Sequence, residues 1–207
     1  MKRLSTGIST LDRQLGGGIP SGSTLVLSAT PASQSELFLY ELIRARPTLY
    51  LTTLRSEDAV RDSINRAAIP PNDPKIAEID GDAPLDQAIQ LISTLPEEST
   101  LVIDPLDPLE ATDPARYRRF LNQLGTHLQN TDSVAVLHAL SGRHTEATRD
   151  VTEYMSDIIF DLRTEIRGSE IVNKLAVPKF RGASALEETI KLKLTESVQI
   201  DTSRDIA

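Results

Sequence analysis

The side chains best placed for chemistry follow two apolar stretches of the chain. Residues 24–29 (Thr-Leu-Val-Leu-Ser-Ala) lead through a turn into residues 33–36 (Ser-Gln-Ser-Glu), where a helix is expected to begin. Residues 100–104 form a second apolar stretch that closes on Asp104. A helix start can hold phosphate on its N–H groups, and a carboxylate at the end of another strand can hold Mg²⁺. The pattern therefore indicates the position of a nucleotide-binding loop.

A longer motif precedes this loop. Residues 5–8 (Ser-Thr-Gly-Ile), the pair Leu11-Asp12 and residues 15–22 (Leu-Gly-Gly-Gly-Ile-Pro-Ser-Gly) follow one another along the chain. They resemble the "TGI-x-x-LD-x-x-LGGGIP-x-G" opening of the KaiC-like branch of the RecA ATPases. The resemblance covers roughly residues 4–200. It implies an α/β, RecA-like P-loop NTPase fold, with a parallel, helix-covered sheet extended by antiparallel strands toward the C-terminus.

The phosphate loop of that family, G-x-x-x-x-G-K-[ST], is altered in this chain. Ala29, Gln34, Ser35 and Glu36 stand at the positions of the first glycine, the second glycine, the lysine and the hydroxyl residue. Glycines let N–H groups turn toward phosphate, the lysine neutralises charge, and the hydroxyl holds Mg²⁺. We therefore expect these four residues and Asp104 to form a vestigial nucleotide site with no cofactor. ATP with Mg²⁺, bound through an altered loop, is the alternative.

The same residues also fit an ordinary helix start. Ser33, with Glu36 three residues later, has the spacing of a capping box. Glu36 would then occupy the positive end of the helix dipole that a phosphate would otherwise use. Pro31 has no N–H to offer a phosphate. A plain strand-turn-helix unit and a decayed nucleotide loop are both compatible with this stretch.

Two further positions concern catalysis. Residues 101–104 resemble a Walker B strand, which delivers an aspartate to the Mg²⁺ side of a nucleotide, although structural strands can also close on Asp. In KaiC-like proteins a glutamate pair after the second strand orients the attacking water, and Leu54 and Arg55 stand there instead. Neither side chain accepts a proton from water at neutral pH. The resemblance therefore implies that ATP hydrolysis is lost and that no catalytic residue remains.

A cationic pair near the C-terminus matches the family. Residues 156–182 resemble its "SD-x-x-x-x-L-R … L-x-V-x-K-x-RG" ending, and Lys179 and Arg181 match the K-x-R pair. In ring-forming relatives this pair reaches the γ-phosphate of the neighbouring subunit. The resemblance implies an oligomer whose protein partner is another copy or an ATPase-competent KaiC-like relative. The alternative is two outward charges on one face of a strand.

Charge and side-chain chemistry exclude several functions. The 207-residue chain has a net charge of -8, which argues against nucleic-acid binding because such binding depends on neutralising phosphates. Residues 139–150, where recombinase relatives place a DNA-contacting loop, carry mixed charges and no aromatic ring, so we predict a plain surface loop. With no cysteine, and with His127, His138 and His144 lacking ligand spacing, no metal site is expected.

The composition also bears on source and location. Six lysines stand against sixteen arginines in an acidic, aromatic-poor chain, which resembles proteins of salt-loving archaea; an ordinary acidic cytosolic protein is the alternative. The chain contains neither an apolar run of about 18 residues nor a leader-like start. We expect a cytoplasmic protein that makes no contact with a membrane.

Alternating strands and helices must position these side chains. Strands predicted at 24–29, 48–52, 75–79, 100–104 and 134–138, with helices between them, imply a parallel sheet covered by helices. Ser56 is predicted to cap a helix that runs to about Ala68. A helix opening at Asp113-Pro114 turns its arginines to solvent. Strands predicted at 158–162, 171–177 and 189–194 form the antiparallel extension.

These patterns favour one RecA/KaiC-like domain at residues 1–200, followed by a frayed tail at 201–207. We expect a non-catalytic pseudo-ATPase, a regulatory or scaffolding protein that acts through protein association and presents Lys179 and Arg181 to a partner ATPase. The alternatives are a weak ATP-binding ATPase and a DNA-repair accessory of the recombinase-paralogue type.

Overall fold

The computed structural model describes residues 2–67, 72–183 and 185–201. The strands are β1 (Arg3–Leu4), β2 (Ile19–Pro20), β3 (Thr24–Ala29), β4 (Thr48–Thr52), β5 (Lys75–Glu78), β6 (Thr100–Asp104), β7 (Val134–Leu140), β8 (Ile158–Arg167), β9 (Glu170–Phe180), β10 (Ile190–Leu194) and β11 (Val198–Ile200). The helices are α1 (Ser9–Gln14), α2 (Glu36–Ala45), α3 (Glu57–Asn65), α4 (Pro84–Ile92), α5 (Asp107–Glu110), α6 (Pro114–Asn130) and α7 (Arg149–Met155).

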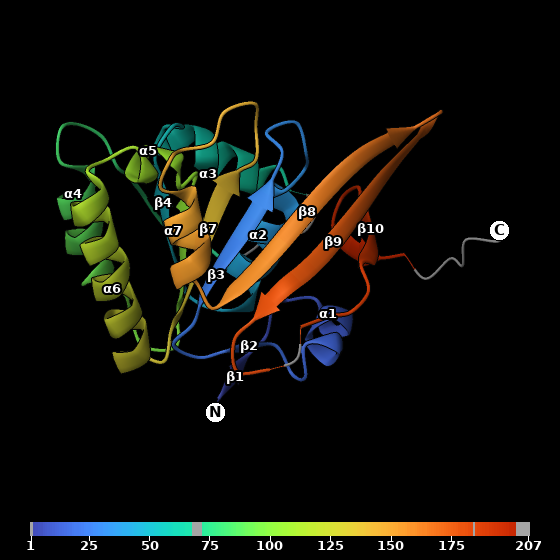
Figure 1. Cartoon of the computed structure of the whole chain (residues 1–207), viewed down its shortest axis with the longest axis horizontal. Coiled ribbons are helices and arrows are strands. Elements are labelled where there is room, and N and C mark those ends of the chain that lie inside the picture. Colours follow the sequence, from blue (N-terminus) through green and yellow to red (C-terminus); the bar gives the residue numbers. More distant parts are fainter. Residues whose placement is uncertain (1, 68–71, 184, 202–207) are drawn as a thin grey trace.

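One large sheet organises the described part of the chain (Figure 1). Its strands lie in the order β11-β10-β9-β8-β3-β7-β6-β4-β5. Strands β3 to β8 run parallel to one another, and β9, β10 and β11 extend the sheet in antiparallel fashion. The predicted parallel sheet with an antiparallel C-terminal extension is therefore confirmed.

Helices cover both faces of the parallel strands. Leu25 and Leu27 of β3 join an apolar core with α1, α2 and α3, whereas Val26 between them joins a second core with α4, α5 and α6. Side chains alternate along a strand, so an unbroken apolar run such as β3 supplies both cores. Figure 1 shows α4 and α6 together on one face of the sheet. This burial holds the carboxyl ends of the parallel strands in place.

The start of α2 differs from the prediction. Ser35 precedes the first residue of the helix and has helical backbone angles, and its side chain makes no capping hydrogen bond. Ser33 Oγ donates to Thr30 O at 2.7 Å instead. The predicted capping box is wrong because the Ser33 side chain closes the preceding turn. The cap predicted at Ser56 is confirmed, since its side chain accepts a hydrogen bond from the N–H of Ala59.

Several bounds also differ. The helix α1 and the strand β11 have no counterpart in the predicted elements, because each is too short to show a periodic apolar pattern. Strands β8 and β9 pair from Ile158 to the tip of their hairpin, well beyond the predicted segments. In the predicted frayed tail, the N–H of Asp201 donates to Lys191 O, and residues 202–207 lie outside the described part.

No helix within the described residues is long and apolar enough to cross a membrane.

Candidate functional site

Four buried side chains form a hydrogen-bonded chain at the carboxyl ends of the parallel strands. His138 of β7 lies in the middle: its Nε2 is 2.9 Å from Ser35 Oγ, and its Nδ1 is 2.5 Å from Asp104 Oδ1. The hydroxyl of Tyr50, from β4, donates to the other oxygen of Asp104. None of the four residues is more than 9% exposed. Adjacent strands β4, β6 and β7 thus supply three of the groups, and the start of α2 supplies the fourth.

The charges of these groups determine which atom donates in each bond. Burial acts to raise the pKa of Asp104, but the hydrogen bond and charge of His138, the Tyr50 hydroxyl and the charge of Arg55 lower it below its ordinary value. Burial and Asp104 raise the pKa of Tyr50 well above its ordinary value, so the phenol keeps its proton. An ionised carboxylate only accepts, and His138 Nδ1 must therefore be the donor to Asp104. In the neutral imidazole this leaves Nε2 to accept the proton of Ser35 Oγ.

A hollow of about 670 Å³ adjoins this chain and includes Ser35, Asp104 and His138 in its lining. Tyr40 and Arg55 line it as well, and burial together with the charge of Glu36 raises the pKa of Tyr40. The remaining apolar lining is formed by Pro31, Leu37, Leu54, Ala67, Pro105 and Leu140. The hollow therefore combines apolar walls with a hydroxyl, an imidazole and a guanidinium.

The turn between β3 and α2 is closed by its own hydrogen bonds. Both the N–H and the hydroxyl of Ser33 donate to Thr30 O, at 3.0 and 2.7 Å. Next to them Pro31 has no N–H to donate. These donors therefore point into the turn and not toward a phosphate.

The sequence-predicted site residues are only partly brought together. Ser35, Glu36 and Asp104 line the same hollow. Gln34 lines a neighbouring hollow beneath the β8–β9 hairpin, and Ala29 is fully buried in the core. Residue 29 could therefore serve a phosphate only through its backbone N–H, not through its side chain.

Leu54 and Arg55 follow β4, at the positions where the resemblance places a catalytic glutamate pair, and neither has a carboxylate. Leu54 is 67% exposed. The guanidinium of Arg55 donates to Ala59 O at 2.8 Å, which ties it to the first turns of α3. Arg55 therefore brings a positive charge to the rim of the hollow, and Leu54 brings an apolar surface.

Lys179 and Arg181 lie at the opposite end of the sheet from the hollow. Lys179 Nζ donates to the carbonyl oxygens of Glu153 and Tyr154, at 2.6 and 2.8 Å, and Arg181 also donates to Tyr154 O. Burial and the charge of Arg181 lower the pKa of Lys179. Arg181 pairs with Asp157 at 3.4 Å and keeps 55% of its side chain exposed. Both cations thus cover the last carbonyls of α7, and neither can reach the chain's own hollow.

The sequence comparisons identify a family. A model of a family of unknown function, DUF7125, matches residues 3–207. The chain belongs to this family. A search among curated proteins finds no match to the sequence.

The fold of this DUF7125 chain is similar to that of a KaiC-like protein from the hyperthermophilic archaeon Pyrococcus horikoshii OT3, whose crystal structure is known. The two structures superpose with a TM-score of 0.78, covering 97% of this chain and 99% of the other, at 15% sequence identity. At this identity the likeness shows the fold. The predicted RecA-type, KaiC-like fold is therefore confirmed for the DUF7125 chain.

Sequence reasoning missed two members of the hydrogen-bonded chain in this DUF7125 protein. The sequence predicts His138 only as the end of a core strand without metal-ligand spacing, and Tyr50 only as a member of the strand at residues 48–52. Both lie in buried strands: the other members of β7 are all apolar, and those of β4 are leucines and threonines. A titratable side chain near the carboxyl end of a buried parallel strand was the signal that could have identified His138.

A second cluster lies beside the site, where a plain surface loop was predicted. Arg149 is buried at the start of α7, and its Nε donates to both carboxylate oxygens of Glu110, at 3.0 and 2.9 Å. Its guanidinium also pairs with Asp107 at 2.9 Å. The prediction for residues 139–150 is therefore wrong at Arg149, whose charge is used inside the protein. The sequence does not indicate this ion pair, because Arg149 and Glu110 are 39 positions apart.

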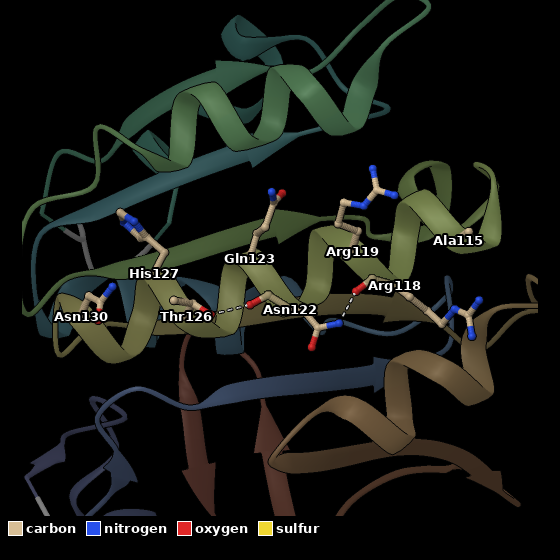
Figure 2. Close-up of a pocket in the computed structure, with 8 residues that line it drawn as sticks. All are labelled: Ala115, Arg118, Arg119, Asn122, Gln123, Thr126, His127 and Asn130. Atoms are coloured by element: carbon tan, nitrogen blue, oxygen red, sulfur yellow. Dashed lines mark hydrogen bonds between the residues drawn. The ribbon is translucent and has the colours of Figure 1, made fainter.

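The outer face of α6 forms another hollow, of about 740 Å³. Figure 2 shows Arg119, Gln123 and His127 projecting from one side of the helix. Among the described residues, neither Arg118 nor Arg119 forms an ion pair, which agrees with the predicted solvated face. Within the described residues no group of three or more His, Cys, Asp or Glu side chains could hold a metal ion. The whole lining comprises Ala115, Arg118, Arg119, Asn122, Gln123, Thr126, His127 and Asn130.

Proposed function

We propose that this DUF7125 chain is a pseudo-ATPase: a KaiC-like domain that does not hydrolyse ATP and that acts through association with a protein partner. The observation that carries the proposal is the state of Asp104, the residue at the Walker B position. Both of its oxygens already accept hydrogen bonds, from His138 and Tyr50. Coordination of Mg²⁺ by this carboxylate would have to displace at least one of these buried donors.

The phosphate side of the site supports the same proposal. Ser35 replaces the lysine, and its hydroxyl is bonded to His138. Glu36 replaces the hydroxyl that would hold Mg²⁺ and adds negative charge where a triphosphate would lie. Two unit charges of like sign at about 4 Å repel by about 4 kcal/mol at an effective dielectric constant of 20. A triphosphate is therefore disfavoured in the hollow unless a cation accompanies it.

The cations Lys179 and Arg181 support the association with a partner. Residues for the chain's own nucleotide site are replaced, whereas this pair, which in ring-forming relatives serves the neighbouring subunit, is present. The hydrogen bonds to Tyr154 O hold both side chains at one place on the surface. We propose that the partner is an ATPase-competent KaiC-like relative or a second copy. A cation supplied in trans contributes about 10³–10⁵ in rate in GTPases, so a regulator needs nothing more than this pair and a docking face.

Nucleotide binding tests the first half of the proposal. Purified protein, titrated with Mg-ATP in a calorimeter at low and at molar KCl, is expected to show no binding and no release of phosphate. Both salt conditions are needed because we infer from the acidic composition a protein adapted to high salt. A micromolar dissociation constant would contradict the proposal and favour the weak ATPase.

Partner activity tests the second half. Candidate ATPases from the same cell are mixed with wild-type protein, with the Lys179→Ala/Arg181→Ala variant, and with an Arg118→Ala/Arg119→Ala variant. The control removes the same charge from the outer face of α6. The wild type and the control are expected to change the partner's ATP turnover, and the Lys179/Arg181 variant is not. If no partner responds, or if both variants behave like the wild type, the cationic pair has no role in trans.

A further inference from the structure

The order of groups in the buried chain, hydroxyl to imidazole to carboxylate, is that of a serine hydrolase. We propose that Ser35, His138 and Asp104 form an acyl-hydrolase site, in which Ser35 is the nucleophile for carboxylic esters bound in the 670 Å³ hollow. This activity goes beyond the proposed association with a partner. It uses the place of the ATP site for different chemistry and requires neither nucleotide nor partner.

The bond geometry places each group in the role required. Ser35 Oγ lies 2.9 Å from His138 Nε2, within the reach of a nucleophile and its general base. The carboxylate of Asp104 accepts from Nδ1 at 2.5 Å, which fixes the imidazole tautomer with its lone pair on Nε2. Tyr50 donates to the second carboxylate oxygen and keeps Asp104 oriented. Asp104 is therefore a positioning residue that acts through His138.

The helix α2 adds a favourable field at the nucleophile. It has ten residues and begins immediately after Ser35. The N–H groups of a first helical turn carry partial positive charge, which stabilises the negative oxygen that develops on an attacked carbonyl. The charge of Glu36 opposes this field, and the N–H groups of Leu37 and Phe38 already donate to Gln34 O and Ser35 O, so the contribution of the helix is smaller than that of a free helix start. The Ser35 side chain is not used as a cap for this helix, so its hydroxyl stays bonded to His138.

The hollow indicates the class of ester. Leu37, Leu54 and Tyr40 offer an apolar wall for an acyl chain, and the volume of about 670 Å³ suits a small organic molecule. Ser35 and His138 are only 4% and 6% exposed, so the ester carbonyl must enter the hollow to reach them. Arg55 lies in the same lining, and its guanidinium can donate hydrogen bonds to a polar group on the substrate. The site therefore fits esters of short to medium apolar acids.

The reaction balances with water as the only co-reactant. Ser35 Oγ bonds to the acyl carbon while its proton passes to His138 Nε2. The bond to the leaving alcohol breaks, and the alkoxide takes that proton. Water then attacks the acyl carbon and gives a proton to Nε2, the bond to Ser35 Oγ breaks, and the serine recovers the proton. The products are an acid and an alcohol.

Labelling of the full chain tests the proposal directly. A fluorophosphonate probe is expected to form a covalent adduct on Ser35, located by peptide mass mapping, in folded protein but not after unfolding in urea. Hydrolysis of p-nitrophenyl butyrate is expected in parallel. Ser35→Ala should abolish both signals, and His138→Gln should lower both by about 10²–10⁴-fold. Asp104→Asn should lower kcat and leave KM near the wild-type value.

Two controls match the variants in chemistry. Ser93→Ala and His127→Gln remove a serine and a histidine outside the hollow, and both should retain labelling and turnover. The absence of an adduct on Ser35 in folded wild type overturns the proposal, as does an adduct that forms equally fast in urea or in folded His138→Gln. If a variant does not fold, the comparison of labelling in folded and in urea-unfolded wild type still tests the proposal. The ATP titration is a separate measurement, so failure here is distinguishable from failure of the pseudo-ATPase proposal.

Discussion

At the scale of single residues, Asp104 connects folding with the site. Its carboxylate accepts hydrogen bonds from Tyr50 and His138, and it is only 9% exposed. Because its pKa is lowered in the folded protein, the charged form is favoured more by folding than the neutral form. This carboxylate therefore contributes to the stability of the fold.

The pH dependence of stability follows from that shift. A group whose folded pKa is lowered stabilises the fold above its unfolded pKa, near 4, and this contribution is lost as pH falls through the lower, folded pKa. We expect the free energy of unfolding, measured by urea denaturation, to fall below about pH 4. Asp104→Asn should lose about 1–3 kcal/mol at pH 7 and show a flatter acid dependence.

An exposed carboxylate serves as the control for this prediction. The Asp73 side chain is 90% exposed and only 3.3 Å from Arg61, so Asp73→Asn should leave both stability and its acid dependence close to those of the wild type. Equal acid dependence in the wild type and in Asp104→Asn would contradict the assignment.

At the scale of elements, the starts of α2 and α3 show two different uses of serine. Ser56 has an extended backbone and accepts the N–H of Ala59, whereas Ser35 is helical and its hydroxyl serves His138. Extended backbone at the residue before a helix is what lets a side chain turn back to the first N–H groups. The helix α2 therefore lacks the capping hydrogen bond that Ser56 provides to α3, because the Ser35 hydroxyl is bonded to His138 instead.

The two helix starts therefore respond differently to loss of a serine hydroxyl. Ser56→Ala should cost about 1 kcal/mol of unfolding free energy and speed amide hydrogen exchange at Ala59. Ser33→Ala, at the position where the capping box was predicted, removes only the bond to Thr30 O and should not speed exchange in α2. Faster exchange in the first turn of α2 would show that Ser33 caps the helix in solution.

At the scale of the whole molecule, net charge decides the response to nucleic acid. The charge is -8, and Arg149, one cation of the loop that recombinase relatives use for DNA, is buried against Glu110. We expect no shift of single- or double-stranded DNA in gel assays at low salt, where phosphate contacts are strongest. Binding that falls steeply as salt rises would instead support the recombinase-paralogue alternative.

The fold was accessible from the sequence because its main signals are local. A strand with one face exposed alternates apolar and polar residues, whereas the apolar residues of the 100–104 strand follow one another without a break. Together with the alternation of strands and helices, this indicates a parallel sheet covered on both faces. The Asp113-Pro114 start of α6 and the Ser56 start of α3 are likewise encoded within a few residues. Such features depend on backbone geometry close in sequence and could be predicted before the structure was known.

The candidate site depends on contacts between distant residues and needed the tertiary structure. Ser35 and His138 are 103 positions apart, and His138 and Asp104 are 34 apart. They meet because β3, β7 and β6 are neighbours in the sheet, an order that differs from their order in the chain. Residue types predicted that Ser35 and Asp104 lie near a former nucleotide site. That His138 joins them into one hydrogen-bonded chain follows only from the packing of the strands. This packing removes the three polar side chains from water, and each of them is stable there because it has a hydrogen-bond partner.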